Sequence, residues 1–200
     1  MDLNNEITKI SYSLGVNIGQ SLAEQGLKEV NGEAFAKAIS DFFEGNDLDI
    51  KSDEAQQNLQ EYFGKIQAEN AGIQAKAGLE FLEANSKKDG IVSLPSGLQY
   101  EVITIGDGEK PSADDKVNTH YHGTLIDGTV FDSSVQRGEP ISFPLNGVIA
   151  GWTEALQLMP VGSKWRLFVP SHLAYGERGQ GAIQPHSTLI FEVELLAIEK

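Results

Sequence analysis

The residues with the clearest chemical meaning are aromatic and branched side chains that accompany one acid. Asp127-Gly128 lies between two apolar runs, which is the strongest short-range signal for a tight hairpin turn, and the second run ends on Phe131-Asp132. The side chains that could converge on one cup are Tyr121, Phe131, Ile149, Trp152 and Tyr175. Such a cup would hold a bulky apolar group.

The acid at the end of the hairpin needs a partner. A carboxylate beside apolar residues is costly unless it is paired, and Arg137, five residues after Asp132, can supply the opposite charge. Taken alone, aromatic and branched residues at strand spacing fit an ordinary core equally well. Asp132 weighs against that interpretation.

Other candidate sites have weaker support. His120 and His122 share a strand face and could begin a metal site, but no cysteine supports it, and exposed polar residues would show the same spacing. Gly179-Gln180-Gly181 suggests a phosphate loop, but no Lys-Ser/Thr follows it. Ser171 and His172 could join an acid in a catalytic triad, but no nucleophile-elbow motif is present. We expect no metal and no cofactor.

The second half of the chain must position these residues on strands. Turn signals separate its apolar segments, and the last of them alternates as a half-buried strand does. The predicted strands are 98–104, 116–125, 129–132, 141–143, 164–169 and 189–198. With one short helix at 152–158, this pattern predicts an antiparallel sheet curled against that helix.

The first half has helical periodicity. Apolar residues recur on one face at Ile7, Ile10, Leu14, Ile18 and Leu22. Ser11, Gly15 and Gly19 form a second row, which indicates either tight packing within one chain or an interface with a second subunit. A second helix would run from Asn31 to Gly45. Because two short helices make a thin core, we expect residues 1–50 to form a homodimer.

A third helix is predicted from Ser52 to about Ser86, because no proline interrupts the chain before Pro95. Its polar middle is typical of a rod between two packed bodies. We therefore predict an α+β protein with a helical dimerisation domain at 1–50, a long connecting helix at 51–90 and a sheet domain at 91–200.

Composition narrows the class of protein. A net charge of −14 argues against nucleic acid and anionic lipid as partners, and no apolar run approaches the roughly 18 residues of a membrane span. The chain contains no cysteine, so disulfides and thiol chemistry are excluded. The N-terminus has no basic region followed by an apolar core, which predicts a cytoplasmic protein, or a periplasmic one if a signal peptide was trimmed.

The second half, from about Ser96, resembles an FKBP-type peptidyl-prolyl cis-trans isomerase. The matching motifs are Tyr121-x-Gly123, Phe131-Asp132-Ser133-Ser134, Val148-Ile149-x-Gly151-Trp152, Ala174-Tyr175-Gly176 and Pro185-His186-x-Thr188-Leu189-x-Phe191. The first half resembles the helical dimerisation segment of bacterial two-domain FKBPs, the FKBP22 and macrophage infectivity potentiator group. Its matches are Ser11-Tyr12-Ser13-Leu14-Gly15 and Leu82-x-x-Asn85.

The resemblance implies a proline-binding cup. Its lining would be Tyr121, Phe131, Asp132, Arg137, Phe143, Val148, Ile149, Trp152, Tyr175, Ile183 and Phe191. By the same resemblance Trp152 would form the floor, and the Ile149 N–H and the Tyr175 hydroxyl would donate to substrate carbonyls. Asp132 would be held by Arg137 and by the Tyr121 hydroxyl.

The chain departs from better-known single-domain members of that family at three positions. Ile141 stands where an aromatic residue is common, Gln180 where a histidine is common, and Gln184 where a second proline is usual. These changes bear on substrate preference and on affinity for tacrolimus or rapamycin, which the resemblance implies as ligands.

The implied reaction suits these residue types. Rotating an X-Pro amide crosses a barrier of about 18–20 kcal/mol without making a bond, so neither a nucleophile nor a metal is required. We expect an isomerase acting on proline-containing peptides and partly folded proteins, with chaperone-like binding in a dimer cleft. The alternative is a holding chaperone or binding module with little catalysis.

Overall fold

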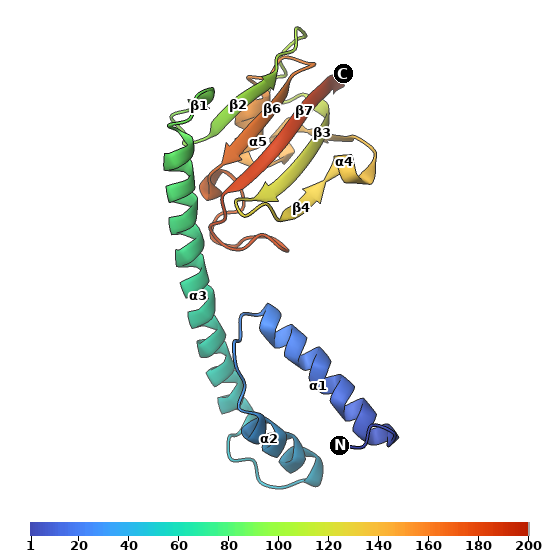
Figure 1. Cartoon of the computed structure of the whole chain (residues 1–200). Helices are drawn as coiled ribbons and strands as arrows, with labels where there is room; N and C mark the ends of the chain where they lie inside the picture. The colour runs from blue at the N-terminus through green and yellow to red at the C-terminus, as the bar shows by residue number, and fades with distance from the viewer. Residues whose placement is uncertain (200) are drawn as a thin grey trace. The chain divides into compact units, whose positions relative to one another are not determined.

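The computed structural model describes residues 1–199, and the chain divides into two compact units, Met1–Ala68 and one that begins at Glu69. The first unit is helical. It contains α1 (Glu6–Glu24), α2 (Gly32–Glu44) and the first part of α3 (Ser52–Asn85), whose remainder belongs to the second unit (Figure 1). No helix among residues 1–199 is long and apolar enough to cross a membrane.

Helix α2 begins and ends where the sequence predicts, and both short helices carry an asparagine cap. The Asn5 side chain accepts a hydrogen bond from the Thr8 N–H at 3.0 Å, and Asn31 caps α2 in the same way. Gly45, at φ 75°, ends α2 in the left-handed conformation that favours glycine.

The glycines of the small-residue row of α1 contact nothing within the first unit. A Cβ built on Gly15 or Gly19 would meet no atom within 4 Å, and no residue of α1 or α2 is buried. The first unit therefore gives no support to tight packing within one chain as the explanation of the row.

The second unit is an antiparallel sheet with the strand order β1-β2-β6-β7-β3-β4, and β5 also pairs with β3 (Figure 1). The strands are β1 (Ile91–Ser93), β2 (Gln99–Thr104), β3 (Lys116–Leu125), β4 (Val130–Ser133), β5 (Ile141–Pro144), β6 (Lys164–Val169) and β7 (Leu189–Glu199). The helices are α4 (Ser134–Arg137), α5 (Ala150–Leu156) and two 3-10 turns, Leu145–Gly147 and Ser171–Leu173. The predicted sheet curled against a short helix is confirmed, although β1 and α4 were not predicted.

The core lies between one face of the sheet and α5. Burial alternates along β3 and β7, so that Val117, Tyr121 and Val193 point inward while their neighbours are more exposed. Helix α5 approaches β6 closely, because a Cβ on Gly151 would lie 2.5 Å from Val169 Cγ1. This close approach fixes the start of α5, which carries Trp152, against β6.

The last turns of α3 pack against the sheet. The rings of Phe81 and Phe168 lie 5.9 Å apart. Asn85, 1% exposed, donates to Gln99 Oε1 at 3.0 Å, and Gln99 donates to the Leu82 carbonyl at 2.9 Å. The Leu82-x-x-Asn85 motif thus fixes the end of α3 to the first long strand.

Candidate active site

The inner face of the sheet is hollowed into a cup of about 720 Å³, within the range of small-ligand sites. The cup is lined by Tyr121, Phe131, Asp132, Ile141, Phe143, Gly147, Val148, Ile149, Trp152, Tyr175, Gln180, Gly181, Ala182, Ile183 and Phe191. Every predicted site residue except Arg137 is among them. Gly147, Gly181 and Ala182 were not predicted, and their only signal was adjacency to predicted loop residues.

The bottom of the cup is a cluster of rings around Trp152. Its indole lies 5.2 Å from the rings of Tyr121 and Phe191, both near-perpendicular, and 5.4 Å from Phe143. Trp152 is 5% exposed, and its buried Nε1 has no hydrogen-bond partner among residues 1–199. Edge-to-face packing of this kind makes a rigid, apolar surface.

One wall depends on a glycine in β3. The rings of Phe131 and Phe191 meet edge to face at 5.4 Å directly over Gly123. A Cβ on Gly123 would lie 2.7 Å from Phe131 Cζ and 3.0 Å from Phe191 Cε1. The glycine of the Tyr121-x-Gly123 motif therefore makes room for the two phenyl rings.

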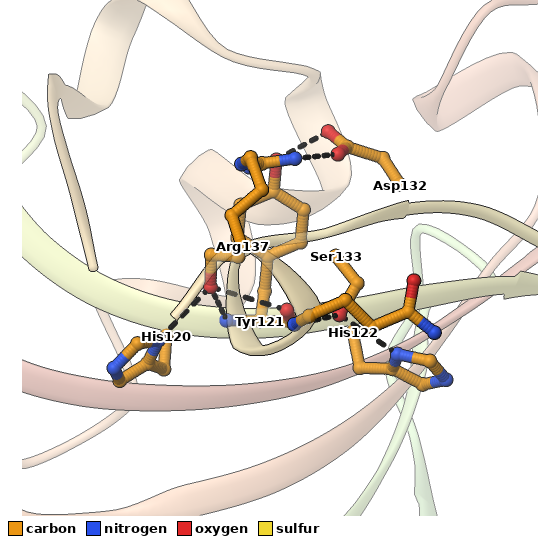
Figure 2. A network of polar contacts seen from close by, with 8 residues as sticks. His120, Tyr121, His122, Asp132, Ser133 and Arg137 are labelled. Carbon is orange, nitrogen blue, oxygen red and sulfur yellow. Dashed lines mark hydrogen bonds and ion pairs between the residues drawn. The ribbon is translucent and has the colours of Figure 1, made fainter. Parts of the chain in front are cut away.

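The polar group of the cup is a triangle of Tyr121, Asp132 and Arg137 (Figure 2). The Tyr121 hydroxyl donates to Asp132 Oδ2, and Arg137 forms an ion pair with Asp132 Oδ1. Arg137 Nη2 also donates to the Tyr121 hydroxyl at 3.0 Å. Arg137 thus lies behind the lining and holds two residues that belong to it.

The triangle fixes the charge of each member. Burial acts to raise the pKa of Asp132, but hydrogen bonds from Tyr121 and Arg137 outweigh burial and hold that pKa below its usual value. Burial and the hydrogen bond to Asp132 raise the pKa of Tyr121. The carboxylate is therefore charged and the phenol protonated at neutral pH, so the group orients side chains without exchanging a proton.

Two donors at the rim have no partner in the described part of the chain. These are the Ile149 N–H, just before α5, and the Tyr175 hydroxyl. Burial, with the nearby charge of Asp132, raises the pKa of Tyr175, so its hydroxyl keeps its proton. Both groups are free to donate to a ligand.

The remaining predicted candidates do not form a second site. His120 and His122 bind the hydroxyls of Ser134 and Ser133, and no group of three or more His, Asp or Glu within residues 1–199 could hold a metal ion. His172 Nε2 lies 2.9 Å from the Ser96 carbonyl oxygen, where it cannot activate Ser171. Ser133 and Ser134 belong to the motif that the sequence analysis identified, but their hydrogen bonds to His122 and His120 were not predicted.

Comparisons with known proteins agree with this geometry. Residues 107–196 match the family model of FKBP-type peptidyl-prolyl cis-trans isomerases, and residues 7–102 match the model of the domain amino-terminal to them. The chain is 52% identical, over 94% of its length and 93% of the relative's, to the FKBP-type 22 kDa peptidyl-prolyl cis-trans isomerase of Escherichia coli K12. The chain belongs to the FKBP-type peptidyl-prolyl cis-trans isomerases.

Other FKBP relatives match along nearly the whole chain. The outer membrane protein MIP of Legionella longbeachae is 44% identical over 99% of this chain and 88% of its own. The crystal structure of FkpA from Escherichia coli superimposes with a TM-score of 0.77 at 37% identity, covering 98% of this chain and 97% of that one. The protein is thus an isomerase of the two-part bacterial FKBP type, and the alternative of a holding chaperone or binding module with little catalysis is set aside.

Proposed function

We propose that the aromatic cup is the site at which this isomerase twists the X-Pro bond. The proline ring would lie on Trp152, and the Ile149 N–H and Tyr175 hydroxyl would donate to carbonyls on either side of the rotating bond. The observation that carries this assignment is the pair of partnerless donors at the rim of a cup whose floor is a cluster of rings.

The cup favours the twisted amide for physical reasons. Twisting removes resonance, which makes the carbonyl less dipolar and lowers its demand for polar solvation. A dry aromatic surface therefore binds the twisted state better than the planar one. Donors fixed at the rim hold the flanking chain in position while the bond rotates.

Tyr175→Phe tests the assignment. Losing one hydrogen bond of about 1–1.5 kcal/mol should lower kcat/KM on a proline peptide roughly tenfold. The matched control is Tyr100→Phe, because Tyr100 stacks on Trp165 at 4.3 Å and does not line the cup. Equal activities of the two variants would overturn the assigned donor.

We propose the same cup as the binding site for tacrolimus or rapamycin, since its volume and aromatic lining suit a bulky apolar ring system. Ile141 and Gln180 lie on its lining and would set the affinity. A macrolide should inhibit peptide isomerisation competitively, and Trp152→Leu should weaken both binding and turnover.

We propose that the first unit forms a homodimer whose cleft binds partly folded clients. Its support is exposed apolar surface: Ile7 is 74% exposed, Phe42 70% and Phe43 83%. The small-residue row of α1, whose Gly15 and Gly19 contact nothing within the first unit, would let a second backbone approach.

The double variant Gly15→Leu, Gly19→Leu tests the dimer, because an interface and an exposed helix face predict opposite changes in stability. Leucine favours an isolated helix over glycine by roughly 0.8 kcal/mol at each position, so a variant without an interface would gain stability. If the row is an interface, sedimentation will show monomers instead. A variant that remains dimeric, or that gains stability, would contradict the proposal.

We propose a cytoplasmic location, with the periplasm as the alternative; one relative is named an outer membrane protein. Fractionation of the source cells, with a cytoplasmic and a periplasmic marker enzyme in parallel, separates the two.

A further inference from the structure

The outer edge of β3 has a gap at the residues that carry the cup's tyrosine. On that edge β5 pairs with Lys116–Thr119, and β4 pairs with residues 122–124. His120 and Tyr121 fall between the two partners, while β7 pairs with β3 along its other edge. On this edge, therefore, no strand pairs with the main chain of Tyr121, although the polar triangle requires the phenol of that residue to be held in place.

The hydroxyl of Ser134 fills this gap. The Tyr121 N–H donates to Ser134 Oγ at 2.8 Å, and Ser134 Oγ donates to the Tyr121 carbonyl at 3.2 Å. The N–H and C=O of one strand residue point to the same edge, so one hydroxyl reaches both. Ser134 is 0% exposed, and buried main-chain groups without a partner are costly.

The short helix α4 consequently holds Tyr121 at both ends. Ser134, its first residue, binds the main chain, and Arg137, its last, binds the phenol. Ser133 caps the same turn by accepting from the Gln136 N–H at 3.2 Å. The position of the Tyr121 ring, 5.2 Å from Trp152, is therefore set by one helical turn.

His120 completes the hydrogen bonding of Ser134 from the other side of the strand (Figure 2). A hydroxyl has one hydrogen and two lone pairs. Its hydrogen goes to the Tyr121 carbonyl and one lone pair takes the Tyr121 N–H, so the second accepts from His120 Nδ1, 3.1 Å away. This arrangement requires the His120 proton on Nδ1.

We propose that Ser134 and His120 are positioning residues for the isomerase, which act through Tyr121. Neither lines the cup, so neither touches substrate. The inference rests on the proposed cup being catalytic. A displaced Tyr121 would disturb alignment in the transition state more than binding to the aromatic floor, so we expect kcat to fall with little change in KM.

The test is Ser134→Ala in the full-length protein, compared with Ser163→Ala. Ser163 is also 0% exposed and also accepts from a main-chain N–H, that of Gly106 at 2.9 Å, but contributes nothing to the cup. Both variants should lose stability. Only Ser134→Ala should lower kcat, by about tenfold, with KM unchanged within about twofold.

A spectroscopic readout separates positioning from general loosening. Nitrogen-15 NMR of the His120 ring should show Nδ1 protonated in the wild type and in Ser163→Ala. In Ser134→Ala the partner of Nδ1 is gone, so the tautomer with the proton on Nε2 should increase. An unchanged tautomer, or equal kcat in the two alanine variants, would overturn the inference.

His120 supplies a second variant if Ser134→Ala does not fold. His120→Leu removes the donor and should lower kcat about threefold, whereas His120→Asn keeps an N–H donor at the δ position and should restore it. Equal kcat in these two would also contradict the inference. Asp132→Asn, measured in parallel, tests the cup itself: unchanged turnover there means that the proposed site fails, whatever Ser134 does.

Discussion

At the scale of single residues, one set of side chains in the cup provides the apolar contact surface, and a different, polar set holds side chains in place. Trp152 and the rings around it offer a dry surface with no proton to exchange. Asp132 and Arg137 form an ion pair with each other, and both are hydrogen-bonded to the Tyr121 hydroxyl. An amide rotation needs a surface of fixed shape and polarity, and this division supplies both.

Asp132→Asn should reduce catalysis without unfolding the protein. The amide keeps the shape of the carboxylate but loses a charge-assisted hydrogen bond from Tyr121, worth about 1.5–3 kcal/mol. It also loses the ion pair with Arg137, worth about 1 kcal/mol or less because the two side chains are 45% and 42% exposed. We expect kcat/KM on a proline peptide to fall between tenfold and a hundredfold. Circular dichroism matching the wild type would show that the fold persists, and wild-type turnover would contradict the role of Asp132.

The same carboxylate predicts a pH dependence of stability. Because the folded protein lowers the pKa of Asp132 below its ordinary value of 3.8, the charged form stabilises the fold above that pH, and the contribution is lost as pH falls through the folded pKa. Urea unfolding should show the wild type more stable than Asp132→Asn at pH 6. The difference should shrink as the pH falls below 3.8 and through the lowered pKa of folded Asp132, and a constant difference would refute the linkage.

At the scale of elements, the last turns of α3 are part of the sheet's support. Gly78 packs so closely on Thr188 that a Cβ would overlap its Oγ1. Thr188 is buried directly before β7, whose Phe191 forms a wall of the cup. The fit of α3 against this corner therefore bears on the strand that carries a site residue.

Gly78→Ala and Gly72→Ala should change stability in opposite directions. Overpacking at Gly78 should cost about 1–3 kcal/mol of unfolding free energy. Gly72, on the same helix, has no atom within 4 Å of its Cβ position, so alanine there should add about 0.5–1 kcal/mol through helix propensity. Thermal and urea unfolding of both variants measure this, and a stabilising Gly78→Ala would refute the close packing.

The sequence predicted the elements that repeat a pattern and missed those that do not. The cap at Asn31 and the hairpin turn at Gly128, with φ 87°, were both predicted from residue types. Strand β1 and helix α4 are too short to show a period. The bonds from Ser134 to Tyr121 depend on a gap between two partners of β3, which only the folded register reveals.

At the scale of the whole molecule, the two units differ in how much of their apolar surface is buried, which indicates different roles. The first buries no residue of α1 or α2, whereas the second has a continuous core and the cup. Such a contrast fits a subunit interface joined to a catalytic unit. The predicted boundaries at residues 50 and 90 separate the dimerisation role from the catalytic role. A stable catalytic fragment must begin before residue 90, because the last turns of α3 contact Phe168 and Gln99.

A fragment of residues 69–200 should therefore be monomeric and should isomerise a short proline peptide at the full-length rate. It should accelerate the proline-limited refolding of a protein at least tenfold less than the full chain, because two linked sites raise the effective concentration of a client. The matched control is the full-length Gly15→Leu, Gly19→Leu variant, which keeps every other residue and should behave like the fragment in both assays. If the fragment sediments as a stable dimer, or if the monomeric variant refolds clients as well as the wild type, the division of roles between the two units is wrong.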